Sequence, residues 1–162
     1  MKQEMEQLVK CLNTQKYLYS ELLKLGEDKK KVIIENRIDE LNEIVEQEKT
    51  IITKLSAIET FRQKCAERIN KDLGLDTDSN LAAVIEKAEG TKDVLSGLLS
   101  ELSDVIFKLK KVNNLNSGLI NMQLDYIDVV KSSFFSNSIN NYGNDGKSSK
   151  EQQSINLFDR MV

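Results

Sequence analysis

Hydrophobic residues recur along most of the chain in alternating steps of three and four positions, which places them on one face of an α-helix. Gln15, Gly26 and Lys29 interrupt the first such stripe, and a glycine inside a helix costs about 1 kcal/mol relative to alanine. We interpret Gly26 as a glycine that the helix tolerates. The stripe predicts a first long helix over residues 2–35, with the apolar members Met5, Leu8, Leu12, Tyr19, Leu22 and Ile33.

A turn at residues 35–37 separates this helix from a second one. Asn36 is expected to cap the second helix, with Asp39 at the third position. Gly74 offers a left-handed stop after about Leu73. Two helices of about 50 Å each predict an antiparallel hairpin. The apolar stripe of the second helix consists of Leu41, Ile44, Val45, Ile51, Ile52, Leu55, Ile58, Cys65 and Ile69.

A loop rich in capping side chains, residues 75–80, precedes a short predicted helix that ends near Gly90. The longest helix is then predicted from Thr91 to about Phe135, and its sustained heptad-like rhythm favours left-handed supercoiled packing. At roughly 65–70 Å it is expected to extend beyond the hairpin at its C-terminal end. Its stripe consists of Leu95, Leu98, Leu102, Val105, Leu109, Val112, Asn116, Leu119, Gln123, Tyr126 and Val130.

The composition changes after Ser136. Residues 137–154 are mostly Asn, Ser, Gly, Gln and Lys, which is typical of a flexible linker, and residues 155–162 are apolar again. The sequence therefore predicts an all-α fold: an elongated, coiled-coil-like antiparallel helical bundle of three long helices and one short helix over residues 1–136. A flexible tail with a short apolar C-terminal segment is predicted over residues 137–162.

The chain contains no histidine, so imidazole bases, Ser-His triads and His-ligated metals are excluded. It also contains no proline, which suits long uninterrupted helices. Gly146-Lys147-Ser148 resembles the end of a phosphate-binding loop, but Asn141 stands where that loop needs a glycine, and no strand precedes it. We therefore predict no enzyme activity, no catalytic residue, no metal and no cofactor.

Charged residues of both signs are mixed along the chain, with 23 basic and 26 acidic side chains, so nothing indicates a nucleic-acid partner. Cys11 and Cys65 are isolated, and the predicted hairpin places them about one helical turn apart. Free thiols suit a reducing cytoplasm. The acidic N-terminus lacks the features of a secretory signal, and no run of about 20 apolar residues indicates an integral membrane segment. We expect a cytoplasmic protein.

Polar residues within the apolar stripes are the candidates for function. Glu48 and Arg62 in the second helix are interpreted as register or edge ion-pair residues. Asn113, Asn116 and Gln123 lie on the stripe of the longest helix and allow two interpretations: they fix the register through buried hydrogen bonds, or they belong to a mixed amide and apolar groove that lacks an intramolecular partner. Side chains that extend this groove are Tyr126, Ile127, Val130, Phe134 and Phe135.

The tail also leaves two interpretations open. Leu157, Phe158, Met161 and Val162 form an apolar edge on a nascent helix that is too short to be stable alone. It is either a frayed end or a docking segment that folds onto a groove of this protein or of a partner.

Several stretches together resemble the FlgN family of flagellar type III export chaperones. They are Asn113-x-x-Asn116-x-x-Leu119-Ile120, the tail element Tyr142-Gly143-x-x-Gly146, the start of the second helix from Asn36 to Leu41, Ile44-Val45 with Glu48, and Ile58-Glu59 with Arg62. The resemblance covers essentially the whole chain, although the segment from Leu157 to Val162 departs from the family pattern.

The resemblance implies a small helical chaperone without enzyme activity that binds hook-associated proteins, the hook–filament junction subunits, near their C-terminal helices and delivers them to the flagellar export apparatus. A self-associating structural coiled coil, a homo-oligomer through the long helix or the tail, is the alternative. The residues expected to bind a partner are Asn113, Asn116, Leu119, Ile120, Gln123, Tyr126, Ile127, Val130, Phe134, Phe135, Tyr142, Leu157, Phe158 and Met161.

Overall fold

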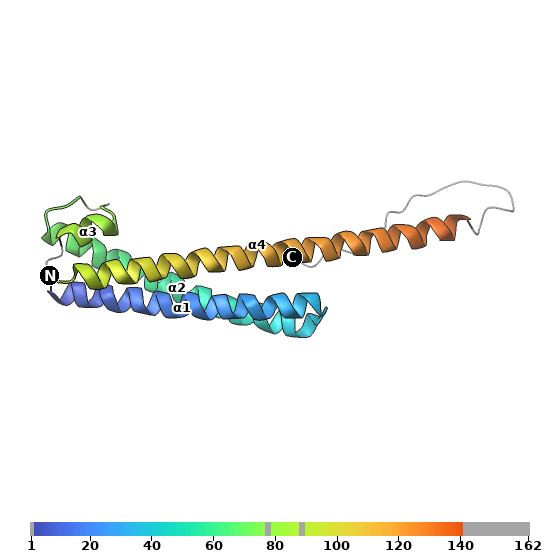
Figure 1. Ribbon diagram of the computed structural model, residues 1–162, viewed down its shortest axis with the longest axis horizontal. Coiled ribbons are helices and arrows are strands. Elements are labelled where there is room, and N and C mark those ends of the chain that lie inside the picture. The colour runs from blue at the N-terminus through green and yellow to red at the C-terminus, as the bar shows by residue number, and fades with distance from the viewer. Residues whose placement is uncertain (1, 77–78, 88–89, 141–162) are drawn as a thin grey trace. The chain divides into compact units, whose positions relative to one another are not determined.

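The computed structural model describes residues 2–76, 79–87 and 90–140, and every regular element in these ranges is a helix. The helices are α1 (Lys2–Ile34), α2 (Ile38–Asp72), α3 (Leu81–Lys87) and α4 (Lys92–Asn140) (Figure 1). The predicted all-α class, with three long helices and one short helix, is thus confirmed. The chain divides into two units, Met1–Met122 and Gln123–Val162, so that α4 begins in the first and ends in the second.

The turn between α1 and α2 is where the sequence predicted it, but Asn36 acts differently. Its φ is 55°, a left-handed conformation that asparagine tolerates better than most residues. Two backbone hydrogen bonds close the end of α1 around it, from Arg37 N to Val32 O at 2.9 Å and from Asn36 N to Ile33 O at 3.1 Å. Asn36 therefore ends α1, and the prediction that it caps α2 is wrong: the capping position is Arg37, whose side chain makes no cap hydrogen bond.

The end of α2 has the same geometry. Gly74 has a φ of 65°, and the amide of Leu75 donates to the carbonyl of Asn70 at 2.8 Å, as predicted for a glycine stop. Asn70 is fully buried, and its side-chain amide donates to the carbonyl of Ser79 at 3.2 Å. At the start of α3 the side chain of Asn80 accepts a hydrogen bond from the amide of Ala83 at 3.0 Å, so this loop does carry the predicted cap.

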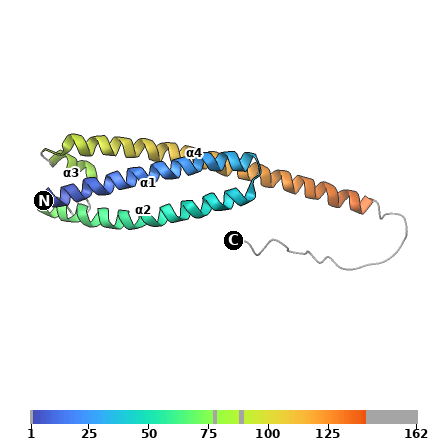
Figure 2. The ribbon, with the colours of Figure 1, turned by 90° about the horizontal axis from the view of Figure 1, so that it is seen from below.

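Within the first unit α2 runs antiparallel to α1, and α4 runs in the direction of α1, with α1 between the other two in the view of Figure 2. A contact from Lys16 to Glu101 and another from Asn116 to Gly26 set the register of α4 on α1. The paired residues of α1 and α4 are 85 to 90 positions apart in the sequence. The last residue of α1, Ile34, therefore lies beside residues of α4 close to Met122.

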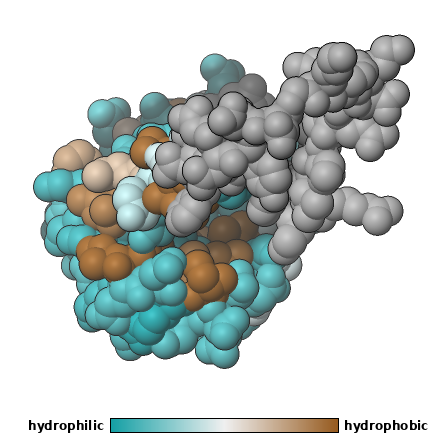
Figure 3. All heavy atoms as spheres, turned by 90° about the vertical axis from the view of Figure 1, so that its right-hand side faces the viewer, coloured by the Kyte–Doolittle hydropathy of each residue, from teal (hydrophilic) through white to brown (hydrophobic). Residues whose placement is uncertain are grey.

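The hydrophobic core of the first unit is concentrated where α3 joins the three long helices. A second, smaller cluster of Leu18, Leu22 and Leu55 lies further along the hairpin. At the end that carries the α1–α2 turn, hydrophobic side chains reach the surface among hydrophilic ones (Figure 3), and Ile34 and Ile38 on either side of the turn are both more than half exposed. The main cluster consists of Met5, Leu8, Leu12, Ile69, Val84, Ile85, Leu95, Leu98 and Leu102.

The longest helix continues further than predicted. It ends at Asn140 rather than near Phe135, so residues 137–140 are helical and not part of a linker. Polar residues such as Asn and Ser have moderate rather than prohibitive helix propensities, and no proline or glycine intervenes before Gly143. The remainder of the predicted tail, residues 141–162, lies outside the described residues.

Candidate partner-binding surface

The apolar stripe of α4 is most deeply buried near its N-terminus, where Leu95 is completely buried. Among the described residues of the stripe after Leu102, only Asn116 is buried: Val105, Leu109 and Val112, and later Leu119, Gln123 and Val130, are half-buried, and Tyr126 is 70% exposed. The stripe itself continues unchanged in spacing over this length. The later part of α4 therefore presents the sequence of a core helix with its apolar face only partly covered.

The residues that flank this stripe on one side also change from charged to apolar along the helix. If Leu95 and Leu98 occupy positions a and d of the heptad repeat, position g holds Val94 in the first turn of α4 and then Glu101 and Lys108. Further on, the same position holds Leu115, Met122 and Val129, which are 44%, 69% and 62% exposed. Position e is apolar in both parts of the helix, at Leu99 and Ile106 and again at Ile120 and Ile127, so the change from charged to apolar residues lies at position g. These exposed apolar side chains make the later part of α4 a candidate interaction surface.

Asn116 is the most deeply buried of the predicted site residues, with only 2% of its surface exposed. Its side-chain nitrogen donates a hydrogen bond to the carbonyl of Gly26 at 2.8 Å, and its Oδ1 is buried without a partner. This contact fixes the register of α4 on α1, as one of the two interpretations expected. A buried amide of this kind specifies one alignment at a cost in stability.

The other predicted site residues are distributed over both units. Asn113 is exposed, whereas Leu119, Ile120, Gln123 and Val130 are half-buried. Asn113, Asn116 and Ile120 line the same cavity, of about 300 Å³. Tyr126 and Ile127 are exposed. Phe134 and Phe135 belong to α4, but their side chains are outside the described part of the chain, as are the residues Tyr142, Leu157, Phe158 and Met161.

Gly26 has a specific role that the sequence interpretation missed. A Cβ atom at this position would lie 2.9 Å from Cγ1 of Val112 and 3.8 Å from Oδ1 of Asn113. Valine is stiff about χ1 and cannot easily swing away. The missing side chain thus lets α1 and α4 approach closely at the point where Asn116 binds the Gly26 carbonyl.

The other two interruptions of the α1 stripe are matched by polar residues of α2. Lys29 donates to both carboxylate oxygens of Glu48 at 2.8 Å, and both side chains are largely buried, which confirms Glu48 as an ion-pair residue. Gln15 donates to Glu59 at 2.8 Å. These contacts align the hairpin, because a shift by one turn would bury Lys29 or Glu48 without its counter-charge.

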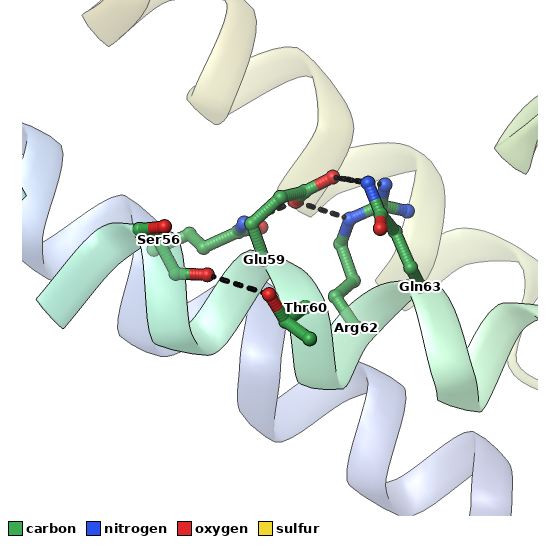
Figure 4. Close-up of polar contacts among 6 residues, drawn as sticks. Ser56, Glu59, Thr60, Arg62 and Gln63 are labelled. Carbon is green, nitrogen blue, oxygen red and sulfur yellow. Dashed lines mark hydrogen bonds and ion pairs between the residues drawn. The ribbon is translucent and has the colours of Figure 1, made fainter. Parts of the chain in front are cut away.

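Glu59 is the centre of a small polar network on α2. It accepts hydrogen bonds from Arg62 at 2.7 Å and from Gln63 at 3.0 Å, and Figure 4 shows the Glu59 carboxylate pointing toward these two side chains. The Arg62 guanidinium is the main reason why the pKa of Glu59 is lowered to about 2, and the hydrogen bond from Gln15 lowers it further. Arg62 is therefore an ion-pair residue, as expected.

A groove of about 710 Å³ lies between α2 and α4, with α1 as its floor and α3 at one end. Its walls include Leu99 and Ile106 at position e of α4, which were not among the predicted site residues; their seven-residue spacing was the signal that could have identified them. The residues around the groove are Leu12, Gln15, Tyr19, Glu59, Arg62, Gln63, Ala66, Glu67, Ser79, Asn80, Leu81, Val84, Leu99, Leu102, Ser103 and Ile106.

The two cysteines are closer neighbours than the sequence indicated. Both are buried and free, and Cys65 donates a weak hydrogen bond to Oε1 of Gln7 at 3.7 Å. Burial raises the pKa of Cys11, and the adjacent Cys65 thiol raises it further. The expected offset of one turn is wrong because the helices meet in the register of the Gln15–Glu59 and Lys29–Glu48 contacts, which brings Cys65 towards Cys11. The thiols act as small apolar core groups.

Comparison with known proteins identifies a family. A family model described as FlgN protein matches residues 1–150. Uncharacterized protein YvyG from Bacillus subtilis (strain 168) is 31% identical over 113 residues, which span 69% of this chain and 69% of that protein. No solved structure matches. Among the described residues, no helix combines the length and hydropathy needed to cross a membrane.

Proposed function

The chain belongs to the FlgN family of flagellar export chaperones, and we propose that it binds the C-terminal helical region of hook-associated proteins, prevents their premature assembly and delivers them to the export gate. The exposed apolar face on the later part of α4 carries this proposal. The family is one of chaperones rather than enzymes, and we place its action in the cytoplasm, where unassembled flagellar subunits await export.

The chemistry of this face suits a helix as client. An amphipathic helix satisfies its own backbone hydrogen bonds and can lay its apolar side along positions a, d, e and g of α4. Contacts are proposed for Leu119, Ile120, Tyr126, Ile127 and Val130. The amides of Gln123, at position a, and Asn113, at position e, are proposed as polar contacts within the same face. Covering these side chains would also cover the apolar face of the client, which suppresses its self-association.

The remaining predicted contacts complete the proposal. Phe134 and Phe135, near the end of α4, are also proposed as partner contacts. Tyr142 and the apolar tail residues Leu157, Phe158 and Met161 would bind either the client or the export apparatus.

Co-purification with a hook-associated protein tests the proposal. The wild-type chain is expected to co-elute with it, and truncation after Ser136 is expected to lower the level of the secreted client. A substitution of Ile127→Glu should reduce co-elution strongly, because it places a carboxylate in the apolar face. Asn121→Glu is the matched control, since it introduces the same charge at an exposed position of the same helix on the opposite face.

Two results would contradict the proposal. One is a failure of the wild-type chain to co-elute together with unchanged client secretion after the truncation. The other is a tight, concentration-independent homodimer or tetramer in light scattering that loses its association in Ile127→Glu, since this result would assign the face to the self-associating alternative.

A further inference from the structure

The part of α4 that belongs to the second unit carries exposed apolar side chains on one side of the helix. Tyr126 and Val129 are 70% and 62% exposed, Ile127 is 46% exposed, and Val130 is half-buried. They occupy positions d, g, e and a of the heptad repeat, which lie on the same side of a helix. We refer to these four side chains as the α4 apolar face.

A second apolar edge follows in the sequence of the same unit, at residues 155–162, which lie outside the described residues. Leu157 and Phe158 are followed one helical turn later by Met161 and Val162, so a helix here would carry all four on one edge. The charged residues at positions 159 and 160 would lie opposite, so docking through the apolar edge buries no charge. This is the pattern of the amphipathic helix proposed as client for the same face.

The chain between α4 and this segment has the length that a contact with the α4 apolar face needs. Helix α4 ends at Asn140, and residues 141–154, the predicted linker, connect it to the segment. A flexible linker of this length has a root-mean-square end-to-end distance of about 20 Å, taken as 5–6 Å times the square root of the number of residues. Asn140 is also about 20 Å from Ile127 along the helix axis, at 1.5 Å per residue.

The match between these two lengths favours the segment over a second copy of the chain. A linker whose root-mean-square length equals the span holds a tethered segment at an effective concentration on the order of millimolar. A second copy would compete at its concentration in solution, which is far lower in dilute protein. In the free protein, the chain's own segment is therefore the favoured occupant.

From these observations we propose that residues 155–162 fold back as a short helix onto the α4 apolar face and occupy it until a client helix displaces them. The proposal rests on the proposed function, because it names a competitor for the same face. Eight residues form no stable helix alone, so the segment must become ordered as it docks, and a longer client helix can replace it. Displacement frees Leu157, Phe158 and Met161 for the export apparatus, which couples client binding to delivery.

Two substitutions in the full chain test the competition. Phe158→Glu places a carboxylate on the apolar edge of the segment, and Asn156→Glu, the matched control, places it on the opposite side. If the segment covers the face for about two thirds to nine tenths of the time, Phe158→Glu should lower the Kd for the C-terminal helical segment of a hook-associated protein about three- to tenfold. Asn156→Glu should leave the Kd unchanged. An unchanged or raised Kd in Phe158→Glu overturns the proposal.

Photo-crosslinking observes the contact without any client. With p-benzoylphenylalanine at position 127, we expect a crosslink to the tryptic peptide of residues 151–160 within a single chain, at a yield that does not depend on protein concentration. The same group at position 128, which lies at position f on the opposite side of α4, is the control and should not capture this peptide. Crosslinks that join two chains, or no capture of residues 151–160 from position 127, overturn the proposal.

The two measurements separate this proposal from the proposed function. If position 127 captures residues 151–160 but the wild-type chain does not bind the hook-associated segment, the fold-back contact stands and the proposed function is wrong. If the wild-type chain binds that segment but position 127 captures nothing from the tail and Phe158→Glu leaves the Kd unchanged, the client contact stands and the fold-back contact is wrong.

Discussion

The early and later parts of α4 belong to one helix with one repeat, yet they differ in what surrounds them. Leu95, Leu98 and Leu102 are buried by α1, α2 and α3, and the flanking position g carries Glu101 and Lys108. Beyond Val112 the stripe is less covered while position g becomes apolar at Leu115, Met122 and Val129. The spacing of the stripe is the same in both parts, whereas position g changes from charged residues at Glu101 and Lys108 to apolar residues from Leu115 onward.

The difference follows from the lengths of the helices. In the register set by the Asn116–Gly26 contact, the last residue of α1, Ile34, lies beside α4 near Met122. Helix α4 contains 49 residues and continues to Asn140. An apolar stripe that outlasts its intramolecular neighbour is selected for a neighbour from another chain or is an aggregation hazard. Because the chain belongs to a chaperone family, we favour a neighbour from another chain as the explanation.

Truncating one side chain in each part of α4 tests the difference between the two parts with the largest expected effect. Leu95→Ala should lower the free energy of unfolding by about 2–5 kcal/mol, because it opens a cavity in the main cluster. Ile127→Ala should change it by less than about 1 kcal/mol, since about half of Ile127 is exposed and alanine has the higher helix propensity. Urea unfolding followed by circular dichroism measures both, and comparable losses would mean that the later part of α4 is core.

Substitutions at the Lys29–Glu48 ion pair test whether this pair sets the register of α1 on α2. Lys29→Met should destabilise by about 1–3 kcal/mol, because Glu48 is left largely buried without its counter-charge. The double variant Lys29→Met with Glu48→Met should recover most of this loss, since two apolar side chains replace the pair. Thermal unfolding of the three proteins checks the prediction. No recovery in the double variant would show that the ion pair itself, rather than avoidance of an unpaired charge, is needed.

Gly26 tests the close approach of α1 to the middle of α4. Gly26→Ala should be destabilising by about 1 kcal/mol, because a clash with Val112 outweighs the gain in helix propensity. Adding Val112→Ala removes the clashing methyl group, so the cost of the alanine at position 26 should disappear in that background. A double-mutant cycle in urea measures the coupling. Additive effects would refute a direct contact.

Much of this arrangement follows from the sequence. The spacing of apolar residues located the helices within a few residues, and it placed Asn36 and Gly74 at the turns. Both Glu48 and Arg62 were identified as ion-pair residues because a charge within an apolar stripe needs a partner. The sequence pattern of one helix does not, however, say which residue on another helix will be that partner.

The missed features depend on how helices meet. Gly26 was read as tolerated because its reason, the close approach of Val112, lies in another helix. Asn36 was assigned to the wrong helix because asparagine serves both as a cap and as a left-handed stop. The α2–α4 groove was not foreseen, since it exists only when α1 separates those two helices. The predicted division of the chain near residue 136 stays a prediction.

The smallest expected effect concerns the Glu59 network beside the groove. Because the Arg62 guanidinium lowers the pKa of Glu59 to about 2, the ionised carboxylate stabilises the fold above its usual pKa near 4.5. That contribution is lost as the pH falls from about 4.5 through 2. The stability difference between wild type and Glu59→Gln should therefore shrink over this range and stay constant above about pH 5. Urea titrations at several pH values measure it, and a pH-independent difference would contradict the assignment.

Hydrogen exchange along α4 tests most directly the claim that its later part is a binding surface. In the free protein the amides of residues 95–116 should exchange slowly and those of residues 123–133 much faster, because only the first set is packed against α1. Adding the C-terminal helical segment of a hook-associated protein should slow the second set by about tenfold or more and leave the first nearly unchanged. Unchanged fast exchange of residues 123–133 at saturating segment would contradict the claim, as would full protection of these residues in the free protein.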